Sequence, residues 1–135
     1  MKTKNFRQLQ VWQRSMELAQ AIYEATQSFP KAELFGMTSQ MRRAAVSVPS
    51  NIAEGQGRLT DKHFALFLAQ ARGSLFELQT QIELSHKLDY LCAARHDQLI
   101  AECTEITRML HALLNVLQES RATTGLTNPA VRFTS

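Results

Sequence analysis

Apolar residues recur at steps of three and four along four stretches of this chain, the spacing that lines one face of a helix. The pattern predicts helices over about residues 6–28, 38–54, 61–90 and 94–119, and the fourth could also begin at Asp97. The fourth stretch has the most regular seam, formed by Leu99, Cys103, Ile106, Leu110, Leu113 and Leu117. Four successive amphipathic helices predict an all-α fold, namely an antiparallel up-down four-helix bundle.

The first predicted helix has two apolar faces. The stripe expected to face the core is formed by Leu9, Trp12, Met16, Ala19, Tyr23 and Thr26. A second flank is formed by Val11, Leu18 and Ile22, and the fourth helix has a similar extra line formed by Ile100, Thr107 and Leu114. Together these faces exceed what one bundle core needs, so we expect identical copies to associate into a cyclic homo-oligomer.

Proline and glycine residues mark where the helices end or bend. Pro30 ends the first helix, because the residue before a proline is disfavoured in the α region. Pro49 lies inside the second helix and lacks a backbone N–H, so we expect a kinked helix or two segments. Gly55 and Gly57 are predicted to end that helix. Gly73 weakens the third helix by about 1 kcal/mol relative to Ala, which predicts a close backbone approach there.

The chain has 135 residues, enough for one domain with its own core, which we place at residues 1–120. From residue 121 the composition shifts toward Thr, Gly, Asn and Pro. Residues 121–135 are therefore predicted to form a C-terminal tail, in which Val131 or Phe133 docks on a neighbouring chain.

Net charge and targeting signals give only weak constraints on the function. The net charge of +3 is compatible with a polyanionic partner but also common in proteins without one. No apolar segment follows the first basic residues as in a secretory signal, and no apolar run reaches the length of a membrane span. Two cysteines are too few for a disulfide framework. We therefore expect a cytoplasmic protein without a membrane partner.

A line of polar residues accompanies the apolar stripe of the second helix at steps of four, four and three. Its members are Arg43, Ser47, Asn51 and Glu54, and Ser74 and Glu77 could meet them from the third helix. We interpret Ser47, Asn51, Glu54, Ser74 and Glu77 as a structural polar network that fixes the register of the two helices. The alternative is a ligand site or a catalytic acid.

Residues 40–55 and Arg58 form the most distinctive segment of the sequence. Its characteristic positions are Gln40, Arg42, Arg43, Ala44, Ala45, Ser47, Asn51, Ile52, Ala53, Glu54, Gly55 and Arg58. This segment closely resembles the core signature of the bacterial four-helix bundle (S23-like) proteins encoded in 23S rRNA intervening sequences, and accessory variability proteins of diversity-generating retroelements look like relatives. The resemblance spans about residues 5–118. It implies an all-helical subunit of a homopentamer, with a proposed nucleic-acid or nucleoprotein role and no established enzymatic activity.

The sequence offers little for catalysis. A di-iron site in a four-helix bundle needs two Glu-x-x-His pairs, and only Glu83 and His86 have that spacing. No phosphate-binding loop or activated nucleophile is recognisable, and Cys103 lies on the core seam of the fourth helix. We expect no enzymatic activity, no metal and no cofactor.

The candidate contacts to a polyanion are Arg42, Arg43, Arg58, Lys62 and Arg72. On one subunit these charges are sparse and could be a solvated rim, but a cyclic assembly would repeat them. The sequence thus predicts a non-enzymatic oligomeric scaffold or adaptor that binds RNA or a nucleic-acid-handling protein through a repeated basic surface. The alternative is a purely structural protein-protein interaction module.

Overall fold

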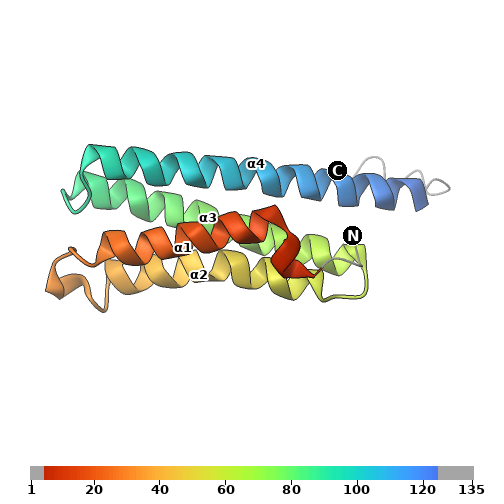
Figure 1. Cartoon of the computed structure of the whole chain (residues 1–135), viewed down its shortest axis with the longest axis horizontal. Coiled ribbons are helices and arrows are strands. Elements are labelled where there is room, and N and C mark those ends of the chain that lie inside the picture. The colour runs from red at the N-terminus through yellow and green to blue at the C-terminus, as the bar shows by residue number, and fades with distance from the viewer. Residues whose placement is uncertain (1–4, 125–135) are drawn as a thin grey trace.

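The computed structural model describes residues 5–124, with side chains up to Glu119, and this part of the chain contains helices but no strand. Its elements are the 3-10 helix η1 (Phe6–Gln8), α1 (Gln10–Thr26), the 3-10 helix η2 (Lys31–Glu33), α2 (Met37–Gln56), α3 (Asp61–Lys87) and α4 (Ala93–Thr124). The four long helices lie side by side along one axis (Figure 1). The all-α prediction is confirmed, and α4 extends five residues beyond its predicted end. The docking predicted for Val131 or Phe133 lies outside the described residues.

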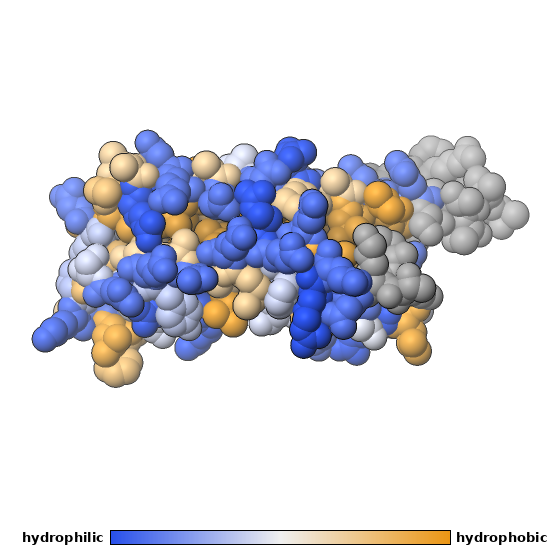
Figure 2. Space-filling view, in the orientation of Figure 1, coloured by the Kyte–Doolittle hydropathy of each residue, from blue (hydrophilic) through white to orange (hydrophobic). Residues whose placement is uncertain are grey.

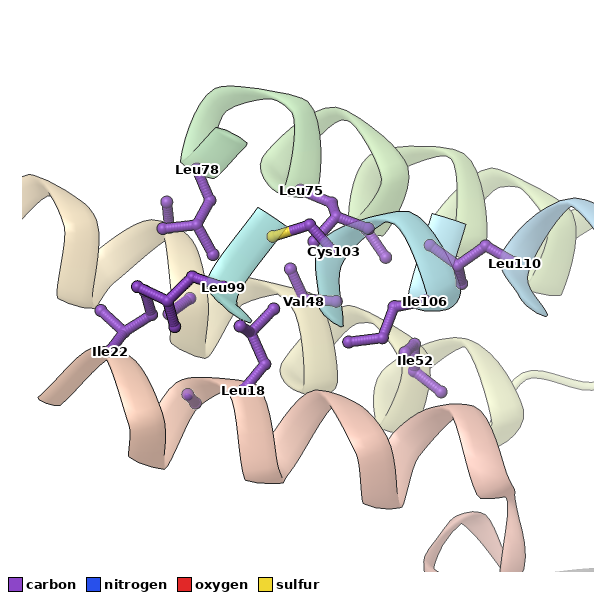
Figure 3. Close-up of a cluster of buried hydrophobic side chains, with 14 of the residues drawn as sticks. Leu18, Ile22, Val48, Ile52, Leu75, Leu78, Leu99, Cys103, Ile106 and Leu110 are labelled. Atoms are coloured by element: carbon purple, nitrogen blue, oxygen red, sulfur yellow. The ribbon is translucent and has the colours of Figure 1, made fainter. Parts of the chain in front are cut away.

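Every long helix contributes an apolar face to one core (Figure 3). The residues labelled there are Leu18, Ile22, Val48, Ile52, Leu75, Leu78, Leu99, Cys103, Ile106 and Leu110. The predicted seam of α4 is buried from Leu99 to Leu110 and again at Leu117, whereas Leu113 is only half-buried. This core holds the surfaces of the four helices at fixed positions.

The face of α1 that enters the core differs in part from the predicted one. Val11, Leu18 and Ile22, expected to form a second flank, are all buried. Met16 and Tyr23, expected in the core, expose 45% and 43% of their surface. Both sets have helical spacing, so periodicity alone could not identify the inner face. The prediction was therefore wrong for Met16 and Tyr23, which leave an apolar strip of α1 at the surface, whereas Leu9, Ala19 and Thr26 of the predicted stripe are buried.

Glycine marks a close helix approach at a different position from the predicted one. Gly55 is buried inside α2, and a Cβ added to it would lie 2.7 Å from Phe67 Cβ and 2.9 Å from Phe64 Cδ1. Helices α2 and α3 therefore approach closely at Gly55. Gly73 is exposed, and a Cβ added there would meet no described atom within 4 Å, so the close approach predicted for Gly73 is wrong within the subunit.

Helix α2 continues through Pro49 and ends at Gln56, with Gly57 as its C-cap. The two-segment alternative is thus wrong, although proline in a helix interior costs about 3 kcal/mol. Burial of Met41, Val48 and Ile52, each 0% exposed, offsets that cost. None of the helices in residues 5–124 combines the length and apolar character needed to cross a bilayer.

Candidate nucleic-acid interface

The Arg42 side chain makes contacts within the subunit that stabilise the fold. Its Nε donates to Thr26 Oγ1 at 2.9 Å and its Nη2 donates to the Tyr23 carbonyl oxygen at 3.4 Å. The guanidinium also lies 4.6 Å from the centre of the Tyr23 ring. Arg42 therefore fastens α2 to α1, and these contacts leave it little freedom to bind a polyanion.

Arg58 also has partners within the subunit. Its Nη2 lies 2.8 Å from Glu54 Oε2, one turn earlier, and its guanidinium lies 4.7 Å from the centre of the Phe67 ring. A phosphate would have to compete with the Glu54 carboxylate for this cation.

The other three candidate cations are available. Within residues 5–119, Arg43, Lys62 and Arg72 make no hydrogen bond or ion pair. Lys62 and Arg72 lie on α3 and Arg43 lies on α2, so all three belong to the α2–α3 half of the bundle, which we define as Met37–Lys87. No carboxylate of the described chain offsets their charge directly.

Formal charge is unevenly divided between the two halves of the bundle. The α2–α3 half contains six Lys and Arg residues against four Asp and Glu residues. Helices α1 and α4 together contain four against six. Ion pairs such as Arg14 with Glu102 and Arg95 with Glu24 join α1 to α4. Figure 2 shows a face covered mostly by hydrophilic residues, with apolar residues in separate patches.

The polar network forms in part. Ser47 Oγ and Ser74 Oγ lie 2.8 Å apart across α2 and α3, and Asn51 Nδ2 donates to the Ser47 carbonyl oxygen at 2.8 Å and to its Oγ at 3.0 Å. Glu54 pairs instead with Arg58, because it lies one turn before it on α2. Glu77 accepts from Gln81 Nε2 at 3.4 Å. The structure thus joins Ser47, Asn51 and Ser74, and places the two carboxylates outside that cluster.

Two histidines stack at the connection between α3 and α4, an arrangement that the sequence spacing did not reveal. The rings of His86 and His96 lie 4.5 Å apart, and His96 Nε2 and Nδ1 contact Glu83 Oε1 at 2.7 Å and Asp97 Oδ1 at 2.8 Å. The hydrogen bond to Glu83 and then that to Asp97 raise the pKa of His96, against a smaller opposing effect of desolvation.

These residues do not assemble a metal centre in the part of the chain described. No three His, Cys, Asp or Glu side chains of that part are placed to hold a metal ion. Burial raises the pKa of Cys103 to about 12, so its thiol stays protonated and packs as a small apolar group.

The fold and its surface define a small all-helical bundle protein with unpaired cations on one half. The chain belongs to the 23S rRNA-intervening sequence protein family, whose model matches residues 7–112. It is similar in fold to a protein of unknown function from the S23 ribosomal protein family of Bacteroides thetaiotaomicron, with a TM-score of 0.70 and 23% sequence identity over 77% of this chain and 97% of that one. None of the curated proteins matches this chain.

Proposed function

We propose that the protein is a non-enzymatic oligomeric scaffold of the cytoplasm that binds RNA or a nucleic-acid-handling protein through its α2–α3 half. The observation that carries this proposal is the group of unpaired cations, Arg43, Lys62 and Arg72, on the more positive half of the bundle. Cations without competing carboxylates can contact phosphates and release counterions, which gives affinity without sequence readout.

The subunit of this scaffold is the antiparallel up-down bundle expected from the sequence. The contacts Ser47 with Ser74 and Met41 with Ser85 support that arrangement, because the earlier residue of α2 meets the later residue of α3. A closed ring of such subunits, five by the resemblance to the intervening-sequence proteins, would repeat the three cations around an axis. Repetition matters because three charges alone bind weakly, whereas linked sites bind together.

Structured RNA is the first ligand to test, since the family description refers to 23S rRNA. Fluorescence anisotropy between 50 and 300 mM KCl would give the affinity and its salt dependence. For the wild type we expect a Kd that rises steeply with salt. Replacing Arg43, Lys62 and Arg72 together with Gln should reduce the slope of log K against log salt by about 0.7 to 0.9 for each phosphate that is no longer neutralised.

A matched control variant loses the same number of positive charges from other helices. Arg14, Arg95 and Arg108 lie on α1 and α4, so replacing these three with Gln should leave the slope nearly unchanged. If wild-type protein is indifferent to both structured RNA and single-stranded DNA at low salt, the nucleic-acid proposal fails, and the structural interaction module becomes the better interpretation.

A further inference from the structure

Two chain connections meet at one end of the bundle and are tied to each other. The α1–α2 connection covers residues 27–36 and the α3–α4 connection covers residues 88–92. Figure 1 places both at the end opposite the α2–α3 connection. The Tyr90 hydroxyl of one connection donates to Glu33 Oε2 of the other at 2.8 Å. A contact that holds residues 88–92 in place therefore also acts on residues 27–36.

The α3–α4 connection contains a strained turn. Helix α3 ends in two hydrogen bonds, from the Tyr90 N–H to the Ser85 carbonyl oxygen at 2.8 Å and from the Asp89 N–H to the His86 carbonyl oxygen at 3.0 Å. This arrangement puts the residue after the helix cap in the left-handed region, which glycine adopts most easily. Here that residue is Asp89, with a φ of 62°. A non-glycine residue in this region depends on the surrounding contacts to remain there.

Two stacked histidines supply contacts to this turn. His86 Nδ1 lies 3.0 Å from the Leu91 carbonyl oxygen, which can only accept, so His86 donates a hydrogen bond to the connection. The His96 ring stacks on the His86 ring with 4.5 Å between their centres. His96 Nε2 lies 2.7 Å from Glu83 Oε1 on α3, and its Nδ1 lies 2.8 Å from Asp97 Oδ1 on α4. His96 thus joins the two helices and supports the ring that contacts the connection.

The two carboxylate contacts of His96 require a proton on each ring nitrogen. A carboxylate oxygen accepts hydrogen bonds and cannot donate them, so each contact needs an N–H of the ring. A neutral imidazole has one N–H and one lone pair. The neutral ring can therefore keep one carboxylate, while the other would face a lone pair and move away. This conclusion follows from the number of N–H groups alone.

The surroundings of His96 allow its proton to exchange with solvent. The His96 side chain is 16% exposed, and those of Glu83 and Asp97 are 54% and 77% exposed. The charged and titratable groups placed against the ring are Glu83 and His86 from α3 and Asp97 from α4, while Glu24 of α1 pairs with Arg95, the residue before His96, at 3.9 Å. The hydrogen bonds to Glu83 and Asp97 raise the pKa of His96, so its proton is lost at a pH above the ordinary value of about 6.5.

We propose that His96 is a proton switch for this end of the bundle. As the imidazolium it donates to Glu83 and Asp97 at once and holds α3, α4 and their connection together. As the neutral imidazole it must release one carboxylate, which loosens residues 88–92 and, through the Tyr90–Glu33 hydrogen bond, residues 27–36. Both connections therefore open more often as pH rises. The switch belongs to the subunit and depends neither on RNA binding nor on assembly.

Nitrogen-15 NMR of the imidazole rings tests the protonation step. At pH 7 the histidine of an unstructured peptide is mostly neutral. We expect His96 to carry a proton on both nitrogens at this pH and on only one of them at pH 9. A mostly neutral His96 ring at pH 7 would overturn the switch, because the two carboxylate contacts would then not coexist.

Hydrogen exchange between pH 6 and 9 tests the opening step. Protection factors correct for the intrinsic pH dependence of exchange, and those of the Tyr90 and Gly36 N–H groups should fall about three- to tenfold as His96 loses its proton. The Tyr90 hydroxyl keeps its own proton over this range, because the hydrogen bond to Glu33 raises its pKa above the ordinary value of about 10. The N–H groups of Gly57 and Phe64, at the α2–α3 connection, are the control and should not follow this fall.

Glu83→Gln distinguishes a proton switch from a merely structural contact. The new amide can donate to Nε2 while the Nδ1–H donates to Asp97, so the neutral ring keeps both contacts. Protection in both connections should then be as high at pH 9 as at pH 6. Glu105→Gln is the control, because it removes a carboxylate that pairs with Arg108 elsewhere on α4, and it should keep the wild-type pH dependence. A Glu83→Gln variant whose protection falls as in the wild type, or wild-type connections that follow the control N–H groups, would overturn the switch.

Discussion

Two adjacent arginines show how helix geometry assigns different roles to identical side chains. Successive residues of an α-helix point about 100° apart, so Arg42 reaches Thr26 and Tyr23 of α1 whereas Arg43 points away from α1. The sequence located both cations on α2. It could not show which of them was paired, because the partners of Arg42 lie on another helix and depend on how α1 and α2 pack.

This difference predicts opposite consequences for the two substitutions. Arg42→Gln should lower the free energy of unfolding by about 1 to 3 kcal/mol, because a part-buried charged hydrogen bond is removed and Thr26 Oγ1 loses its donor. Arg43→Gln should change it by less than about 0.5 kcal/mol and weaken RNA binding instead. Urea unfolding and RNA anisotropy on both variants measure the pair of effects. Equal losses of stability would contradict the structural role of Arg42.

His96 predicts how stability depends on pH. The contacts to Glu83 and Asp97 raise the pKa of His96 in the folded state above the unfolded value of about 6.5. The folded state therefore holds this proton more tightly, and the resulting stabilisation is complete below about pH 6.5 and is lost as pH rises through the folded pKa. The charged and titratable groups that contact His96 are Glu83 and His86 on α3 and Asp97 on α4.

The measurement is the difference in urea midpoint between the wild type and His96→Gln from pH 5.5 to 9. We expect the wild-type advantage to be largest at the acidic end and to shrink toward pH 9. His111→Gln, at an exposed position of α4, controls for losing any histidine. A difference that stays constant over this range would show that the two carboxylate contacts do not raise the pKa of His96.

At the scale of the helix, periodicity identified the elements but not all of their inner faces. The positions in α4 from Leu99 to Leu110 were predicted correctly, because the neighbouring line of Ile100, Thr107 and Leu114 includes a polar residue and is only partly buried beside the seam. In α1 two apolar stripes compete, and the aliphatic pair Leu18 and Ile22 occupies the core while Met16 and Tyr23 remain at the surface. The choice depends on the three neighbouring helices and is therefore absent from any local window of sequence.

The two helix glycines predict substitution effects of opposite sign. Gly55→Ala forces a methyl group within 3 Å of Phe64 and Phe67, so we expect a loss of about 1 to 3 kcal/mol of stability. Gly73→Ala adds its methyl group in open space on an exposed helix face and should stabilise the subunit by about 0.5 to 1 kcal/mol. Denaturation at concentrations where the protein is monomeric measures both. A Gly55→Ala variant as stable as the wild type would contradict the close approach of α2 and α3 at this position.

At the scale of the whole molecule, the bundle separates two kinds of surface. Arg43, Lys62 and Arg72 lie on the α2–α3 half, while Met16 and Tyr23 leave an exposed apolar strip on α1. A ring of subunits would present these three cations once per subunit. Assembly should therefore multiply the effect of the cations on RNA binding.

The gain in RNA affinity from assembly can be measured by comparing RNAs of two lengths. An RNA long enough to span several subunits gains from effective concentration, whereas one that covers a single subunit does not. Dilution below the Kd of self-association keeps every cation of the α2–α3 half but removes the assembly. We therefore expect dilution to weaken binding of the long RNA by about a hundredfold and to leave binding of the short RNA nearly unchanged. Equal losses for both lengths would contradict a gain from linked subunits, and no loss for either would mean that one subunit carries the whole binding site.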